Sequence, residues 1–213
     1  MGLKLFVCSQ EKFGLDVVKA LRAAGNEIVG VAPPPQNRLK DKVYGYAKLN
    51  GIPIVSDCDR LVSADIPDGT DLVVTAFSYW MVSDRVLAET TYGGIGFHPS
   101  LLPRHRGREA VRWTYEMGDA VTGGTVYWLS RDCDGGDILD QRVVFVDRRS
   151  NDYHDIWNDI YPVGVRMLVN AVAAVERGDA PRIPQDERFA TWEPSRERPR
   201  LKRNELVQLG AAQ

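Results

Sequence analysis

The sequence has few cysteines, no long apolar run and no excess of charge of one sign. Its three cysteines, Cys8, Cys58 and Cys133, form no CxxC pair, which excludes a disulfide scaffold and a cysteine-rich zinc site and fits the reducing cytoplasm. Lys and Arg number 27 against 29 Asp and Glu, so a formal net charge of −2 gives no global attraction to nucleic acid or to an anionic membrane. No apolar run approaches the ~20 residues of a membrane-spanning helix, and residues 1–8 are too short and strand-like for a signal peptide. We therefore expect a soluble, cytoplasmic protein.

The sequence also lacks the motifs that mark nucleotide and metal sites. A dinucleotide site needs GxGxxG in the first strand-to-helix turn, but residues 9–14 hold one glycine, and no Walker motif occurs. The three histidines, His98, His105 and His154, build no HExxH pattern. We therefore expect neither a nucleotide function nor a bound metal.

What is present is an alternation of short apolar runs and helical patterns. Continuous apolar runs are typical of strands buried on both faces, and helices of about ten residues between them indicate βαβ units. The expected strands are 3–8, 27–31, 52–55, 71–76, 94–97, 124–129 and 139–146, and the expected helices are 14–24, 40–49, 109–117 and 152–177, the last bent at Pro162. The predicted fold class is α/β, a Rossmann-like, mostly parallel twisted sheet flanked by helices.

The chain changes character near residue 180. Pro181, Pro184, Pro194 and Pro199, with an arginine-rich run at 196–203, are typical of an extended tail. We expect one folded domain over residues 1–180 and a Pro/Arg-rich C-terminal tail over residues 181–213.

The densest run of unusual residues follows the expected strand 94–97. Three glycines lead to His98, and a loop bracketed by Pro99 and Pro103 follows at once. Ligands of open α/β sheets bind beyond the carboxyl ends of the strands, where His98 is expected to lie. Placement alone leaves two interpretations open, a catalytic histidine and a structural one at a strand–loop junction.

A second candidate is the loop between the last two expected strands. It contains Asp132, Asp134 and Asp137 beside Gly135 and Gly136. Such a string is commonly a solvated turn, and the closing Glu of an EF-hand calcium loop is missing. Beside a histidine, one of these carboxylates can instead orient the imidazole and assist proton transfer.

Two segments together resemble the folate-dependent formyltransferase family. They are HPSLLP at residues 98–103 and Asp-Gly-Gly at residues 134–136, which begins 134 − 98 = 36 positions after the histidine. The family includes glycinamide ribonucleotide, methionyl-tRNA and sugar N-formyltransferases, and the chain particularly resembles the hydrolase domain of 10-formyltetrahydrofolate dehydrogenase. The likeness covers roughly residues 3–192 and implies a formyltransferase-type fold, with residues 1–180 as the catalytic domain.

The resemblance implies a role for each matching residue. His98 and Asp134 match the family's catalytic histidine and aspartate. The segment whose backbone contacts the pterin ring is matched by Tyr79, Trp80, Met81 and Val82. Composition alone leaves core packing open for this segment. The opposite wall of the pterin pocket is matched by Asp132, Cys133 and Asp134.

These residue types suit formyl transfer from 10-formyltetrahydrofolate, the implied formyl donor. When an amine or water attacks the formyl carbon, a histidine can hydrogen-bond the oxyanion and assist proton movement to N10. A neighbouring aspartate favours the imidazolium and helps to remove the proton of the nucleophile. The resemblance thus implies a formyltransferase that acts on an amine of a small molecule and needs no metal.

One position departs from the family pattern. The transferases have an asparagine two residues before the histidine, where this sequence has Gly96. Loss of one oxyanion donor typically costs ~2.7–4 kcal/mol of transition-state stabilisation. The hydrolase domain of the dehydrogenase resembles this chain in lacking the asparagine, so a 10-formyltetrahydrofolate hydrolase stays open as the alternative. If the missing amide limits the rate, Gly96→Asn is expected to raise transfer.

The expected partners are a folate and a small-molecule amine acceptor. Arg104 and Arg106 are candidates for binding an anionic acceptor or the folate glutamate tail, with exposed loop arginines as the alternative interpretation. A tRNA acceptor is disfavoured, because the methionyl-tRNA enzymes carry a large C-terminal domain that residues 181–213 do not match. A homodimer stays open. A folate-binding protein without turnover is disfavoured, since it would need neither His98 nor Asp134.

Overall fold

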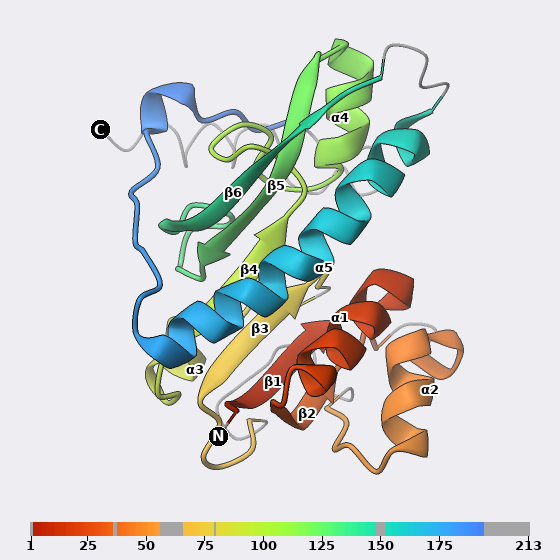
Figure 1. The fold of residues 1–213 in the computed structure, drawn as a ribbon, viewed down its shortest axis with the longest axis vertical. Helices are drawn as coiled ribbons and strands as arrows, with labels where there is room; N and C mark the ends of the chain where they lie inside the picture. The colour runs from red at the N-terminus through yellow and green to blue at the C-terminus, as the bar shows by residue number, and fades with distance from the viewer. Residues whose placement is uncertain (1, 36–37, 56–65, 79, 148–151, 194–213) are drawn as a thin grey trace.

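The centre of the molecule is a six-stranded sheet in the order β2-β1-β3-β4-β5-β6 (Figure 1). The structure is a computed structural model that describes residues 2–35, 38–55, 66–78, 80–147 and 152–193. Tyr79 and the arginine-rich run 196–203, both singled out from the sequence, lie outside the described residues.

Four parallel strands and two antiparallel strands make up the sheet. The parallel strands are β1 (Lys4–Ser9), β2 (Glu27–Ala32), β3 (Leu72–Ala76) and β4 (Gly94–His98). The antiparallel strands are β5 (Val121–Trp128) and β6 (Ile138–Phe145). Every residue of β3 and β4 is buried, as expected for central strands covered on both faces. The predicted α/β class with a mostly parallel sheet is confirmed.

Helices cover the two faces of the sheet unequally. The longest helix runs diagonally across the sheet beside α1 (Figure 1), and these two helices share the larger core cluster with α2 and α4. The four helices are α1 (Glu11–Ala23), α2 (Lys42–Leu49), α4 (Ala110–Met117) and α5 (Tyr153–Arg177). The short α3 (Asp84–Ala88) contributes Val86 to a smaller cluster around Phe6 and Trp80.

The ring of Phe97 explains how α5 can lie close to the sheet. An ideal Cβ on Gly164 of α5 would lie 2.5 Å from this ring, and one on Gly124 of β5 would lie 2.6 Å from it. Phe13 of α1 adds a ring contact with a centroid distance of 5.4 Å. Successive residues of a strand point to opposite faces, so burying Phe97 under α5 turns His98 to the other face at the carboxyl end of β4.

Two local predictions differ from the structure. Residues 52–55 form no strand, and a single parallel bridge joins Ile54 to Val31. Pro53 has no N–H to extend a ladder, which accounts for the difference. The helix α3 was not expected, and it begins where the Ser83 hydroxyl accepts a hydrogen bond from the Val86 N–H.

The segment after α5 turns back along the β6 side of the molecule (Figure 1). Gly178, with φ of +74°, ends α5, and Ile183 then forms an antiparallel bridge with Ile138. After the 3-10 turn η3 (Glu187–Phe189), Trp192 bridges to Arg106. The described part of the predicted tail therefore packs against the loop that follows β4, and the division of the chain at residue 180 stays a prediction.

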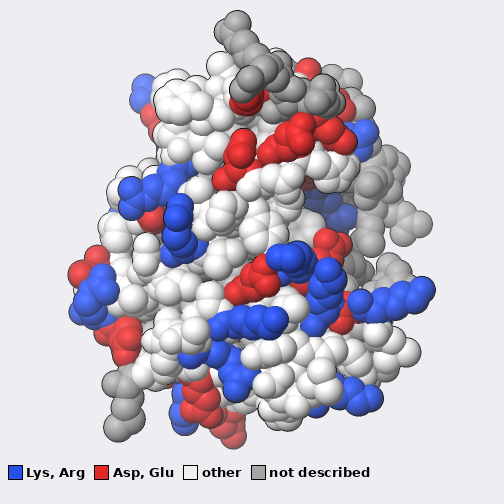
Figure 2. Space-filling view, turned by 45° about the vertical axis from the view of Figure 1, so that its right-hand side comes forward, with Lys and Arg blue, Asp and Glu red and all other residues white. Residues whose placement is uncertain are grey.

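Charged side chains of both signs lie interspersed on the face shown in Figure 2, between wide uncharged areas. This agrees with the nearly balanced total of 27 basic and 29 acidic residues. Within the described residues, no helix has the length and apolar character required to cross a membrane.

Candidate active site

His98, the last residue of β4, is buried, with 6% of its surface exposed. Its Nε2 lies 2.6 Å from the backbone carbonyl oxygen of His105. A carbonyl oxygen can only accept a hydrogen bond, so Nε2 carries a proton and donates it. The other nitrogen, Nδ1, lies 3.6 Å from Oδ2 of Asp134. The ring is thus oriented with Nδ1 toward the carboxylate.

Asp134 is held beside His98 by three donors, of which the weakest is the Cys133 thiol, 3.6 Å from Oδ2. The Tyr127 hydroxyl donates to Oδ1 at 2.7 Å, and the backbone N–H of Gly107 donates to Oδ2 at 2.7 Å. The side chain is 12% exposed, and its backbone adopts φ of +52°, in the left-handed region. The carboxylate is therefore fixed in the site, unlike that of a solvated turn residue.

The loop that carries Asp134 is closed by a glycine and by a distant glutamine. A side chain on Gly136 would collide with the backbone carbonyl of Trp128, which explains why this position requires glycine. Gln185 Nε2 donates to the carbonyl oxygens of Asp134 at 2.8 Å and of Gly136 at 2.7 Å. The segment after α5 thereby fixes the backbone of the loop.

Two neighbours of Asp134 stay uncharged. Burial, followed by the charge of Asp134, raises the pKa of Tyr127 well above its ordinary value, so the phenol remains a donor. The same causes, burial first, raise the pKa of the Cys133 thiol to about 12. Because the thiolate is the reactive form of cysteine, Cys133 is not an activated nucleophile.

The space beside Gly96 is filled by neighbouring strands. An ideal Cβ at this position would lie 2.6 Å from Oγ1 of Thr75 and 3.1 Å from Cε1 of Tyr127. Any side chain here requires the Thr75 hydroxyl to move and the side chains of Leu129 and Tyr127 to yield. An asparagine side chain at position 96 is therefore crowded, and the gain in formyl transfer expected from Gly96→Asn requires these neighbours to move.

The predicted folate-binding segment divides into buried and exposed side chains. Trp80 is 6% exposed, donates from Nε1 to the Pro33 carbonyl at 3.1 Å, and packs with Val82 in the smaller core cluster. Met81 is 61% exposed. Core packing accounts for the side chains of Trp80 and Val82, and Met81 remains accessible to a ligand.

The two predicted substrate-binding arginines lie in different surroundings. Arg106 is 4% exposed, and its guanidinium bonds Gln185 Oε1 at 2.7 Å and both carboxylate oxygens of Glu187 at 2.6 and 2.9 Å. Arg104 has a side chain that is 51% exposed, with its Nη2 3.4 Å from Oδ2 of Asp119. Of the two, Arg104 has the guanidinium that a ligand can reach.

Sequence reasoning assigned no role to Tyr127, Gly107 or Gln185. A signal existed for Tyr127, because alternation along β5 puts it on the same face as Thr125, which pairs with His98. No local pattern predicts what Gln185 contacts, because it is 51 positions from Asp134 and reaches it only where the chain turns back after α5.

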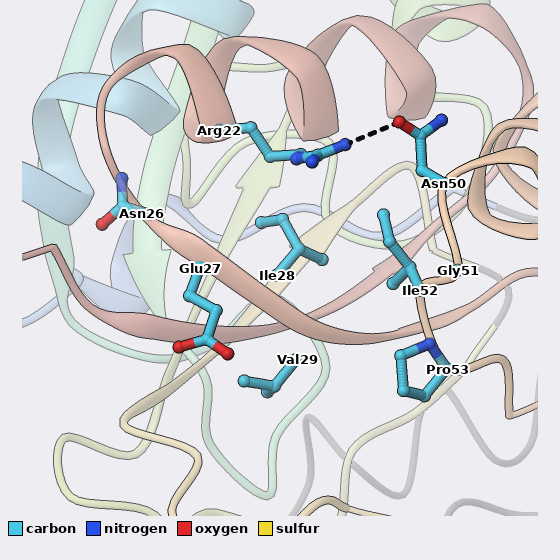
Figure 3. Close-up of a pocket in the computed structure, with 9 residues that line it drawn as sticks. All are labelled: Arg22, Asn26, Glu27, Ile28, Val29, Asn50, Gly51, Ile52 and Pro53. Atoms are coloured by element: carbon cyan, nitrogen blue, oxygen red, sulfur yellow. Dashed lines mark hydrogen bonds between the residues drawn. The ribbon is translucent and has the colours of Figure 1, made fainter.

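A hollow at the opposite end of the sheet has no histidine–carboxylate pair among the residues that line it. It is lined at the start of β2 by Glu27 and Ile28, and beyond α2 by residues 50–53 (Figure 3). The side chain of Arg22 donates to Asn50 Oδ1 at 3.1 Å across it. β2 starts where β1 starts, so the hollow lies away from the carboxyl end of β4.

The fold and the site define an α/β domain with a histidine–carboxylate pair at the carboxyl end of its parallel strands. Residues 59–172 match the family model described as Formyl transferase. The cytosolic 10-formyltetrahydrofolate dehydrogenase of Xenopus laevis is 34% identical over 214 residues, which cover 95% of this chain and 24% of that protein. The methionyl-tRNA formyltransferase of Symbiobacterium thermophilum is 32% identical over 204 residues, covering 89% of this chain and 61% of that protein. The chain belongs to the formyl transferase family, as the sequence motifs predicted.

Solved structures have the same fold. An N-formyltransferase from Helicobacter canadensis matches with a TM-score of 0.76 and 14% identity, covering 92% of this chain and 71% of that chain. A phosphoribosylglycinamide formyltransferase from Anaplasma phagocytophilum matches with a TM-score of 0.69 and 20% identity, covering 84% and 89%. The chain spans about a quarter (24%) of the length of the Xenopus laevis dehydrogenase, so the likeness to that protein concerns one part of it.

Proposed function

We propose that this chain is a folate-dependent enzyme that transfers the formyl group of 10-formyltetrahydrofolate to an amine of a small molecule. The observation that carries the proposal is the fixed pair of His98 and Asp134, 3.6 Å apart, with each side chain oriented by its own hydrogen bonds. Membership of the formyl transferase family and relatives named for 10-formyltetrahydrofolate support this chemistry.

The pair supplies a base for the attacking nitrogen and an acid for the leaving N10, on either side of the formyl carbon. Attack forms a bond from the amine nitrogen to the formyl carbon, and collapse breaks the bond from that carbon to N10. Asp134 takes the proton that the attacking nitrogen loses and passes it to Nδ1 of His98, which then donates a proton to N10 as it leaves. Positioned general acid–base groups contribute roughly 10²–10⁴-fold to such reactions.

For the pterin we propose the surface between the exposed Met81 and the loop Asp132–Asp134. This surface suits an uncharged heterocycle, because the Cys133 thiol is neutral and the backbone of residues 80–82 lies beside the apolar core. Arg104 is the residue that we propose for an anionic part of the acceptor or the folate tail. Arg106 is committed to Gln185 and Glu187.

Water is the second candidate acceptor, and Gly96 favours it. Gly96 stands where the transferases have an asparagine amide, and the Oγ1 of Thr75, 2.6 Å from an ideal Cβ at this position, crowds any side chain placed there. Without that donor, attack by a positioned water on the same formyl group releases formate and tetrahydrofolate. The two candidates use the same pair and differ only in the nucleophile.

Equilibrium binding followed by product analysis separates these candidates. Isothermal titration with 5-formyltetrahydrofolate should show saturable binding to the folded protein, and absence of binding would refute both candidates. Incubation with 10-formyltetrahydrofolate should then give formylated amine in the presence of candidate acceptors. Formate release at one rate with and without amines would contradict transfer and support hydrolysis.

Substitution of the pair tests the mechanism directly. His98→Ala and Asp134→Asn should each lower turnover by roughly 10²–10⁴-fold while far-UV and near-UV circular dichroism stay unchanged. Asp137→Asn is the matched control, since it removes one carboxylate of the same loop that has no role in the pair. Near-normal turnover in Asp134→Asn would refute the role given to this aspartate.

A further inference from the structure

His105 lies at the centre of four contacts in the loop that follows His98. Its carbonyl accepts the hydrogen bond from His98 Nε2 at 2.6 Å, and its backbone N–H donates to Thr191 Oγ1 at 2.8 Å. Its imidazole, 3% exposed, has Nε2 at 2.8 Å from Asp119 Oδ2 and Nδ1 at 3.1 Å from Glu193 Oε1. Nε2 and both backbone groups of His105 are thus hydrogen-bonded, and Nδ1 lies within ion-pair distance of Glu193 without a hydrogen bond to it.

The imidazole of His105 is suited to carry a positive charge between two carboxylates. Burial is the largest single influence and opposes protonation, but Glu193 and then Asp119 outweigh it and raise the pKa of His105 above its ordinary value of 6.5. Among the described residues, Arg104 also faces this cluster, with its Nη2 3.4 Å from Asp119 Oδ2. Charge-assisted pairs of this kind are stronger than neutral hydrogen bonds.

The backbone of His105 needs such support. Its φ is +54°, in the left-handed region, which costs a residue with a Cβ roughly 1–2 kcal/mol. This conformation belongs to the turn that brings the carbonyl to Nε2 of His98. If the side-chain contacts are lost, the peptide can relax and the carbonyl can turn away.

We propose that the His105 side chain is a positioning residue for His98. Held by Asp119 and Glu193, it keeps its own carbonyl on Nε2, and this leaves Nδ1 of His98 as the nitrogen directed at Asp134. The proposal deepens the proposed function, because it names the nitrogen of His98 that works with Asp134, and rests on it in that respect. It also gives residues 191–193 a part in building the site, although they lie far along the chain from His98.

Nitrogen-15 NMR of ring-labelled histidine, combined with steady-state kinetics, tests the proposal. In the wild type, the His98 ring should show a single form with the proton on Nε2. In Glu193→Gln and in His105→Gln, the His98 signals should shift toward a mixture of both tautomers, and kcat should fall up to about 10²-fold while KM for the folate stays unchanged. Asp186→Asn is the matched control. It removes one carboxylate of the same segment, one whose ion pair is with Arg188 and not with His105.

The outcomes separate this proposal from the function itself. A wild-type tautomer in both Glu193→Gln and His105→Gln overturns the positioning role, whatever happens to turnover. A shifted tautomer in a protein that binds no folate supports positioning and refutes the proposed function. If Glu193→Gln fails to fold, Thr191→Val removes the hydrogen bond to the His105 N–H and carries the same expectation for the His98 signals.

Discussion

The site depends on residues whose backbone and side chain act together. Asp134 and His105 both have positive φ, and in each case the strained residue places one group against His98. Strained backbone conformations cluster at functional sites because surrounding contacts must hold them. Here those contacts come from Tyr127 and Gly107 for the aspartate, and from two carboxylates for the histidine.

The position two residues before His98 shows how packing changes a prediction made from sequence. Gly96→Asn alone should lower the free energy of unfolding by roughly 1–3 kcal/mol, because the new Cβ meets Oγ1 of Thr75 at 2.6 Å. Combining it with Thr75→Ala removes that oxygen and should recover part of the loss. Urea denaturation of the single and the double variant measures both free energies of unfolding, and formyl-transfer assays are run on the same proteins.

The double variant also tests the missing amide. If that amide limits the rate, the Gly96→Asn, Thr75→Ala protein should transfer formyl groups to amines faster than the Thr75→Ala protein does. Equal rates in two folded proteins would show that the amide is not what limits transfer. A fully stable Gly96→Asn protein would contradict the crowding described here.

Among the elements, α5 is positioned by the contact between Gly164 and Phe97. Gly164→Ala puts a methyl group 2.5 Å from the Phe97 ring and should lower the free energy of unfolding by roughly 1–3 kcal/mol. Gly45→Ala in α2 is the matched control. Apart from its own stretch of helix, nothing lies within 4 Å of the new Cβ there, so this substitution should be neutral or stabilise by ~0.4–1 kcal/mol. Chemical denaturation compares the two, and equal effects would contradict the packing argument.

The segment after α5 is tied to the site by the buried guanidinium of Arg106. Arg106→Lys should lower the free energy of unfolding by roughly 1–3 kcal/mol, because an ammonium group cannot form the paired bonds to Glu187 and Gln185. KM for the amine acceptor should not change. Arg104→Ala should show the reverse pattern, a raised KM with stability retained. A raised acceptor KM in a stable Arg106→Lys protein would restore Arg106 as a substrate-binding residue.

The regular elements were largely predictable, because each depends on local patterns. The apolar run at β3 and the helical periodicity of α1 identify buried strands and an amphipathic helix directly. The failures have local causes too. Residues 52–55 have strand composition but contain Pro53, and α3 is too short to show a period.

At the scale of the whole molecule, stability should depend on pH through His105. Its folded pKa is raised above 6.5, so its contribution to stability is complete below pH 6.5 and is lost as pH rises through the folded value. The difference in unfolding free energy between the wild type and His105→Gln should therefore shrink across this range. The urea denaturation series should stay below pH 9.0, the ordinary pKa of a thiol such as Cys133, because above that value ionisation of the thiol in the unfolded chain would add a second pH dependence. A constant difference would contradict the charged state assigned to His105.

The sequence by itself determined the α/β class, the family and the identity of the pair His98 and Asp134. These follow from local periodicity and from two short motifs, and a chain carries such information without being folded. The tertiary structure alone decided what holds the pair. Gln185 reaches Asp134 across 51 positions and Thr191 reaches His105 across 86, because the chain turns back after α5. Packing around Gly96 and the burial of Arg106 likewise arise where distant elements meet, and no local pattern encodes them.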